Sequence, residues 1–199
     1  MPHSWDADSP QLHDNLQRVL LRIEVEARNR DAWNSNSLRQ WHIEVMRNLD
    51  APDATIGKFR GEPGLETSEV RIGVHHGVTA AKVGVALTEF NATLHSVLSR
   101  LDQIITISDL NADQLAAVLD VCAWAHSEWV RIHPFANGNG RTARLLANGI
   151  AMRFGLPPFL RLRPRPNDKY GEACEAAMHY NWIPTARLFA EMLKRTLGK

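Results

Sequence analysis

The chain has 199 residues, of which 44% are hydrophobic and 23% are charged, and its formal net charge is +1. This length fits a single domain over residues 1–199 with a sizeable core. A charge so close to neutral argues against a nucleic-acid or membrane partner, and no stretch reaches transmembrane length. The N-terminus has no charged segment followed by an apolar run, so a cytoplasmic location is expected, and delivery into a host cell by a specialised secretion route stays open.

Two amphipathic helices are predicted in the first fifty residues. Ser9 and Pro10 suit the N-cap and the first position of a helix, and apolar residues then follow helical spacing as far as Ala27. A polar break over residues 34–37 precedes the second helix. Pro52 and its polar neighbours are expected to end it.

Between Gly57 and Gly73 the helical period disappears. Residues 57–60 and 68–73 are typical of two short extended pieces around a turn rich in Gly, Pro and Glu. A plain surface loop is the alternative for this segment.

Helical spacing resumes from Thr79 to Leu101. Asn111 and Gln114 then have the spacing of a capping box, with Asn as the N-cap and Gln three residues later. The helix that they open runs directly into His133.

The C-terminal part of the chain is helical as well. One helix is expected to stop at Gly155, and two more are expected to start at Asp168 and Pro184. The whole pattern predicts an all-α bundle with one small β excursion.

Cys122 and Cys174 both lie in apolar helical patterns, which predicts buried, reduced thiols rather than a disulfide or a metal pair. His126 is expected to be a hydrogen-bonded core histidine. A metal site among the nine histidines is disfavoured, because no His-x-x-x-His or Cys-x-x-Cys spacing occurs.

The most informative stretch starts at His133 and reads His-Pro-Phe-Ala-Asn-Gly-Asn-Gly-Arg-Thr-Ala-Arg. Gly138 and Gly140 allow a turn that aims successive N–H groups inward as an anion nest, and a helix starting there adds the positive end of its dipole. Arg141 and Arg144 are three residues apart, so both can point from the first helical turn toward one anion. The stretch predicts a phosphate cradle with a histidine at its rim, against the alternative of a plain corner between two helices.

This stretch resembles the signature of the Fic/Doc family, His-Pro-Phe-x-(Asp or Glu)-Gly-Asn-Gly-Arg-x-x-Arg, at every fixed position except one. The resemblance implies an all-α, Fic-like helical bundle with a small β-hairpin called the flap. It also implies transfer of AMP from ATP to a Ser, Thr or Tyr hydroxyl of a target protein, with ATP and Mg²⁺ as the groups bound.

The resemblance gives most of these residues a role. His133 is the general base, which suits the only side chain of the stretch that titrates near neutral pH. The residues implied to hold the phosphates are Gly138, Asn139, Gly140, Arg141 and Arg144.

Asn137 stands where the family has an acidic Mg²⁺ ligand. An amide oxygen can bind Mg²⁺ but lacks the charge of a carboxylate. Two alternatives therefore stay open, a weakened or silent Fic domain that binds a nucleotide or a partner protein, and a Doc-like phosphotransferase. Gly140 favours nucleotidyl transfer, because Doc-like members have lysine at that position.

Two partners follow from the resemblance. The target protein is expected to dock as an added strand on the flap, residues 57–73. The chain has no Glu followed by Gly or Asn, as the inhibitory motif of many Fic proteins requires. A separate antitoxin-like chain would supply that glutamate to Arg144, or the protein is not inhibited in this way.

Overall fold

The computed structural model describes residues 3–5, 7–105, 110–166 and 169–198. These residues are mainly helical, as the sequence predicts. The α-helices are α1 (Pro10–Arg28), α2 (Ser35–Val45), α3 (Ala80–Ile104), α4 (Ala112–Ile132), α5 (Asn139–Arg153), α6 (Tyr170–Ala177) and α7 (Ile183–Thr196). The shorter elements are β1 (His3–Ser4), β2 (Leu49–Asp50), the 3-10 helix η1 (Asp53–Thr55), β3 (Arg71–Ile72) and β4 (His75–His76).

Local capping signals start the helices where the sequence predicts them. The hydroxyl of Ser9 accepts a hydrogen bond from the N–H of Leu12 at 3.3 Å. Asn111 and Gln114 form the reciprocal capping box at the start of α4. Pro184 lies in the first turn of α7. The helix start predicted at Asp168 lies outside the described residues.

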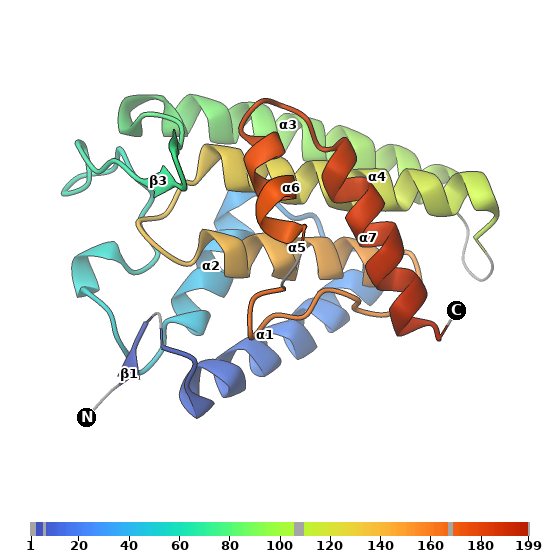
Figure 1. The fold of residues 1–199 in the computed structure, drawn as a ribbon, viewed down its shortest axis with the longest axis horizontal. Coiled ribbons are helices and arrows are strands. Elements are labelled where there is room, and N and C mark those ends of the chain that lie inside the picture. The colour runs from blue at the N-terminus through green and yellow to red at the C-terminus, as the bar shows by residue number, and fades with distance from the viewer. Residues whose placement is uncertain (1–2, 6, 106–109, 167–168, 199) are drawn as a thin grey trace.

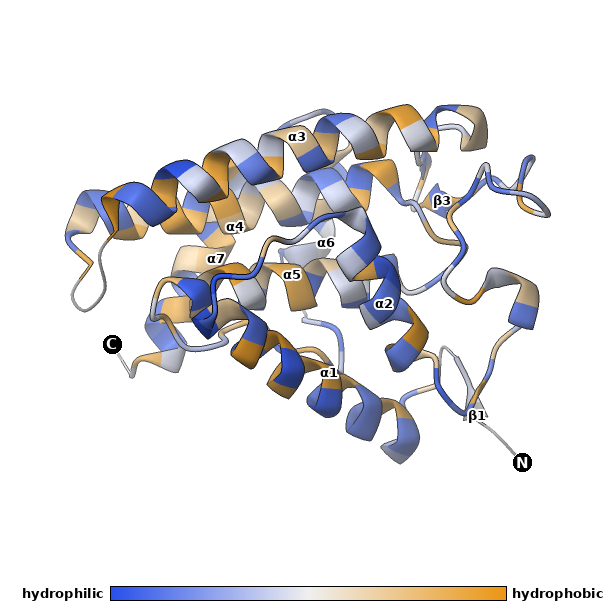
Figure 2. Cartoon of the chain, turned by 180° about the vertical axis from the view of Figure 1, so that it is seen from behind, coloured by the Kyte–Doolittle hydropathy of each residue, from blue (hydrophilic) through white to orange (hydrophobic). Residues whose placement is uncertain are grey.

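Helices α4 and α5 form the centre of the bundle. Helix α4 packs against α3, α5, α6 and α7, and α5 also packs against α1 and α2 (Figure 1). Hydrophobic and hydrophilic residues alternate along α1, as expected of a helix with one face on the core (Figure 2). All residues of α5 except Gly140 and Met152 are buried. The turn from α4 to α5 is therefore anchored in the core by the helices on both sides of it.

The second helix is shorter than the sequence predicts. It ends at Val45, well before Pro52. Asn48 takes a left-handed backbone conformation with φ of 58°, and β2 then pairs in parallel with β1 near the N-terminus. This tertiary pairing, and not the proline, turns the chain away from the helix.

The β-hairpin lies further along the chain than predicted, and the pairing expected between residues 57–60 and 68–73 was wrong. Strand β3 pairs with β4 instead, across a two-residue turn that begins at Gly73 with φ of 60°. Phe59 forms an isolated antiparallel bridge with Phe135. The ring of Phe59 is 5% exposed, so core burial draws the first extended piece away from the hairpin.

The buried environments expected of Cys122 and His126 are confirmed, whereas Cys174 is only half-buried. Both cysteines are free thiols. His126 is buried, and its Nε2 lies 2.7 Å from the hydroxyl oxygen of Tyr170. Among the described residues, no helix combines the length and hydropathy needed to cross a membrane.

Candidate active site

The turn between α4 and α5 begins at His133, whose backbone is left-handed with φ of 53° and ψ of 56°. This conformation is uncommon for a residue that carries a Cβ, and it persists where neighbouring groups support it. The N–H of His133 donates to the carbonyl of Trp129 at 3.0 Å. The side chain of Arg60 donates to the carbonyl of His133 at 2.8 Å. The backbone of His133 is thus held on both its donor and its acceptor side.

The imidazole of His133 has a defined tautomer. Its Nδ1 lies 3.0 Å from the carbonyl oxygen of Val130, and because a carbonyl only accepts, Nδ1 carries the hydrogen. Nε2 is then the nitrogen with an available lone pair. Burial is the main reason that the pKa of His133 falls to about 4; the hydrogen bond to Val130 opposes this shift and the nearby Arg60 adds to it. The ring is neutral near pH 7 and can accept a proton through Nε2.

Asn139 closes the turn from the inside. Its Oδ1 accepts from the N–H of Phe135 at 2.9 Å, and its Nδ2 donates to the carbonyl of Phe135 at 2.8 Å. The residue is only 1% exposed. Its amide group therefore fixes the loop, and its backbone N–H is what it can offer to a ligand.

Pro134 and Phe135 are buried and anchor the loop to the core. The ring of Phe135 packs against Phe59, with ring centroids 5.0 Å apart, and against Trp129, at 5.8 Å. These contacts join the turn to the core on two sides.

His42 supports the same turn from α2. Its Nδ1 accepts from the N–H of Gly57 at 3.1 Å, so Nε2 carries the hydrogen and donates to the carbonyl of Asn137 at 3.0 Å. Gly138 lies against this ring with φ of 84°. A Cβ at Gly138 would come within 2.6 Å of Met46 and 3.1 Å of His42. Both the backbone angle and the lack of space require glycine there.

The first turn of α5 presents N–H groups that have no acceptor within the helix. Those of Asn139 and Gly140 precede the first residue that an α-helix can satisfy, and the helix dipole favours an anion at this end. The N–H of Gly138 instead donates to Oδ1 of Asn137 at 2.5 Å. Of the backbone donors predicted for the phosphates, Asn139 and Gly140 are the ones positioned for an anion.

Arg144 lies beside this turn, because a Cβ built on Gly140 would be 3.2 Å from its Nη1. Its guanidinium donates to the hydroxyl of Tyr170 at 3.2 Å and to the carbonyl of Leu162 at 2.9 Å. Its buried Nε has no hydrogen-bond partner among the described residues. A buried unpaired guanidinium donor is a natural contact for an oxyanion.

Arg141 extends toward the N-terminal segment. It donates to the carbonyl of Trp5 at 2.5 Å and to Oδ1 of Asn137 at 3.0 Å. The two arginines of the signature therefore contact different segments of the chain, and of the two it is Arg144 whose guanidinium lies against Gly140 at the anion-binding end of α5.

Asn137 does not fit a cation in this arrangement. Its Oδ1 accepts from both Gly138 and Arg141, which uses the two lone pairs of an amide oxygen. The part of the chain that the structure describes holds no group of three or more His, Cys, Asp or Glu side chains able to bind a metal ion. The residues present therefore do not form a protein-held Mg²⁺ site.

The sequence did not mark Tyr170 as a residue of the site. Its hydroxyl accepts from Arg144 at 3.2 Å and lies 2.7 Å from Nε2 of His126. Burial raises the pKa of Tyr170 to about 12, so the hydroxyl keeps its hydrogen. In the sequence Tyr170 is one apolar position of a short helix, 26 residues from Arg144, and no local pattern links the two.

A cavity of about 370 Å³ lies between the β3–β4 hairpin and α6. On the hairpin side Nε2 of His75 lies 3.2 Å from Oε1 of Glu175. The residues that line the cavity are Ile72, Gly73, Val74, His75, Arg165, Gly171, Cys174 and Glu175. This cavity lies close to the site, because its lining residue Gly171 directly follows Tyr170, whose hydroxyl binds Arg144.

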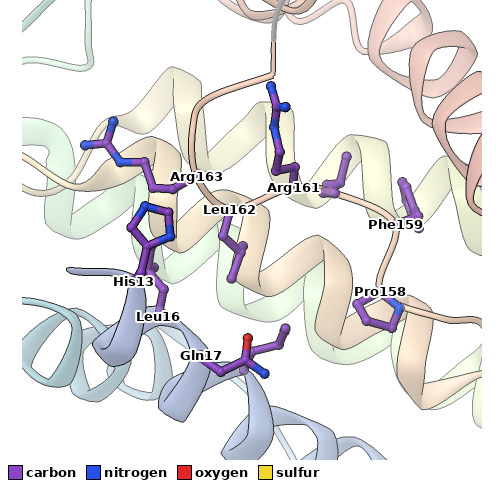
Figure 3. A pocket seen from close by; sticks show the side chains of 10 residues that line it. His13, Leu16, Gln17, Pro158, Phe159, Arg161, Leu162 and Arg163 are labelled. Carbon is purple, nitrogen blue, oxygen red and sulfur yellow. The ribbon is translucent and has the colours of Figure 1, made fainter. Parts of the chain in front are cut away.

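A second cavity, of about 400 Å³, lies between α1 and the extended segment 158–163 (Figure 3). Figure 3 shows His13, Leu16 and Gln17 on the helix side of it, facing the segment that carries Arg161 and Arg163. No residue of the stretch 133–144 lines it. The extended segment 158–163 helps to hold Arg144 in place, because the carbonyl of Leu162 accepts a hydrogen bond from its guanidinium.

Residues 32–151, more than half of the chain, match the model of the Fic/DOC family. A protein of Aedes aegypti named protein adenylyltransferase Fic is 29% identical over 156 residues, which are 78% of this chain and 27% of that protein. Its namesake from Culex quinquefasciatus is 40% identical over 90 residues, 44% of this chain and 18% of that protein. The chain thus covers well under a third of the length of these curated relatives.

Solved structures share the fold. Fic-1 from C. elegans superposes with a TM-score of 0.67 at 24% identity, covering 97% of this chain and 52% of that one. The BepC protein of Bartonella tribocorum, solved with bound AMPPNP, gives a TM-score of 0.61 at 16% identity and covers 96% of this chain and 91% of that one. The helical bundle with its small hairpin is therefore an arrangement that these proteins have in common.

Proposed function

Because this chain belongs to the Fic/DOC family, we propose that it is a protein adenylyltransferase, which moves AMP from ATP to a Ser, Thr or Tyr hydroxyl of a target protein. The relatives named protein adenylyltransferase Fic support this activity. The observation that carries it is the tautomer of His133. With Nδ1–H on Val130, its Nε2 is a neutral base at the rim of an anion-binding helix start.

In the proposed reaction Nε2 of His133 takes the proton of the acceptor hydroxyl. The hydroxyl oxygen attacks the α-phosphorus, and the bond to the bridging oxygen breaks so that pyrophosphate leaves with the electron pair. The N–H groups of Asn139 and Gly140 and the guanidinium of Arg144 are the preorganised donors for the charge on the phosphates. The buried, unpaired Nε of Arg144 supports this role.

The nucleoside is proposed to occupy the cavity between the hairpin and α6. Its volume of about 370 Å³ lies within the range of roughly 300–1,000 Å³ typical of small-molecule sites. Tyr170 connects its α6 wall to Arg144. Gly77, directly after β4, lies against His133, since a Cβ there would be 2.9 Å from that of His133. A Mg²⁺ ion that accompanies the nucleotide would depend on phosphate oxygens and water, because Asn137 offers no free oxygen.

The target protein is proposed to dock on the flap segment, now extended to residue 76 by the observed hairpin. Val74 at the hairpin turn is 74% exposed, an apolar side chain open to a partner. An added strand on the hairpin would bring its hydroxyl near His133. A separate inhibitor chain acting on Arg144 would have to reach a residue that is only 3% exposed.

The test uses purified protein, a cell lysate, Mg²⁺ and ATP labelled at either the α- or the γ-phosphate, with His133→Ala as the control. Protein labelling from α-labelled ATP alone, lost in the variant, is the expected result. Labelling from γ-labelled ATP alone would make the protein a phosphotransferase. Bound nucleotide without labelling across different nucleotides and lysates would support the silent binding module, which Asn137 favours.

A further inference from the structure

Arg60 is a buried arginine whose side chain has 0% exposure. Its Nε donates to the carbonyl of His133 at 2.8 Å, and its Nη2 donates to the carbonyls of Ile132 at 2.9 Å and Val78 at 2.6 Å. Its Nη1 donates to the carbonyl of Ser68 at 3.1 Å. One guanidinium therefore holds four backbone carbonyls from two segments that are far apart in sequence.

The first pair of carbonyls belongs to the end of α4. The last carbonyls of a helix lack partners within it and carry the negative end of the helix dipole, so a buried cation there is stabilising. The backbone N–H of Arg60 also donates to the carbonyl of Pro134 at 2.7 Å. Three consecutive carbonyls, Ile132 to Pro134, are thus bound by one residue exactly where His133 takes its left-handed conformation.

The second pair, Ser68 and Val78, flanks the β3–β4 hairpin on both sides. A Cβ at Gly77 would lie 2.9 Å from the Cβ of His133 and 3.1 Å from Nη2 of Arg60. The chain that leaves the hairpin therefore runs directly over the histidine. Any shift of the hairpin relative to α4 changes the space above the imidazole.

We propose that Arg60 is a positioning residue that couples the hairpin to His133. Arg60 sets the distance between the strand on which a target protein would dock and the histidine that would take the proton of the target's hydroxyl. This role rests on the proposed function. Arginine suits this role because its rigid planar fork reaches four acceptors at once, whereas the single ammonium of lysine cannot span them. Glu69, with Oε2 3.7 Å from Nη1, supplies a partial counter-charge.

The test compares Arg60→Lys with Arg153→Lys. Arg153 is a matched buried arginine, since its side chain is 5% exposed and it donates to the carbonyls of Arg30 and Asp31 as well as to Asp102. Both variants are expected to unfold at a lower temperature. Arg60→Lys alone should lose kcat for transfer, by about hundredfold, because a small displacement near the reacting groups suffices for that. KM for ATP should stay within about twofold in both.

Gly77→Ala provides a second route, because its Cβ displaces the same segment without removing the guanidinium. Gly84→Ala is its control, since a Cβ at Gly84 meets nothing within 4 Å. We expect Gly77→Ala to lower kcat and Gly84→Ala to leave it unchanged. If Arg60→Lys does not fold, this pair of variants tests whether the position of the hairpin controls kcat. Equal kcat in the two variants would then overturn the coupling.

Amide hydrogen exchange tests the coupling without turnover. Arg60→Lys should speed exchange both in residues 68–78 and in residues 132–135, whereas Arg153→Lys should affect neither. If the unmodified protein transfers no AMP, the proposed function fails. Amide hydrogen exchange alone then tests whether Arg60 couples the hairpin to His133. Unchanged kcat in Arg60→Lys, or faster exchange confined to residues 68–78, would overturn the role of Arg60.

Discussion

The imidazole of His42 stacks on the ring of Phe135, with the ring centroids 3.9 Å apart and the planes at 18°. The same imidazole binds the carbonyl of Asn137 and the N–H of Gly57. His42 therefore joins helix α2 to the α4–α5 turn in two ways, by stacking on Phe135 and by a hydrogen bond to Asn137. The geometry of the anion-binding end of α5 depends on a residue 95 positions away from Asn137.

Replacing His42 should destabilise the protein. His42→Ala removes two buried hydrogen bonds and a stacked ring, and we expect a loss of about 3 kcal/mol in the free energy of unfolding. Urea denaturation followed by circular dichroism measures it. His95→Ala is the control, because His95 is exposed on α3, and it should change the stability by less than about 0.5 kcal/mol. Equal losses in the two variants would show that His42 has no special role.

Gly138→Ala tests how tightly the turn is packed. In this variant a residue with a Cβ is held at a positive φ of 84°, and its Cβ would lie 2.6 Å from the side chain of Met46. Gly155→Ala is the matched control, since its φ of 79° is similar but a Cβ there meets nothing within 4 Å. We expect Gly155→Ala to cost about 1 kcal/mol and Gly138→Ala about 2 kcal/mol more, measured by thermal unfolding. Similar costs would mean that the turn can relax away from α2.

The stability should fall on mild acidification. Burial lowers the pKa of His42 and of His133 to about 4 and that of His126 to about 3, from an ordinary value of 6.5. Below 6.5 the unfolded chain therefore binds protons that the folded protein does not, and each histidine removes stability at about 1.4 kcal/mol per pH unit until its folded pKa is reached.

Urea titrations between pH 7 and 5 measure this slope before most carboxylates titrate. His126→Gln should reduce the slope by about one proton, because it removes one of the three histidines whose pKa is lowered in the folded protein. A flat profile in the unmodified protein would contradict the neutral state of the three rings.

The parts of the fold that the sequence predicts are those with local causes. Ser9 caps α1 through a residue three positions away, and Asn111 and Gln114 cap α4 within one turn. The end of α4, the glycine turn and the start of α5 are contiguous in the sequence, so their chemistry could be interpreted from a dozen residues.

Contacts between residues far apart in the chain could not be predicted from the sequence, because they leave no local pattern in it. Arg60 meets the carbonyl of His133 across 73 positions, and a side chain that binds backbone carbonyls imposes no periodicity on the sequence. The hairpin was misplaced because Phe59 is drawn to Phe135 by burial, a tertiary contact that local β-propensity does not contain. Tyr170 reaches Arg144 from another helix and was missed in the same way.

Asn137→Asp should make transfer less dependent on Mg²⁺ concentration. In the unmodified protein Oδ1 of Asn137 accepts from Gly138 and Arg141, and the other atom of the amide is a donor that repels a cation. An aspartate keeps the two accepted bonds on one oxygen and frees a second, charged oxygen for the ion. We expect the Mg²⁺ concentration for half-maximal labelling to fall by about tenfold. Asn181→Asp, an exposed site at the start of α7, should not change it, and an equal shift in both variants would mean that general charge and not this position controls the metal.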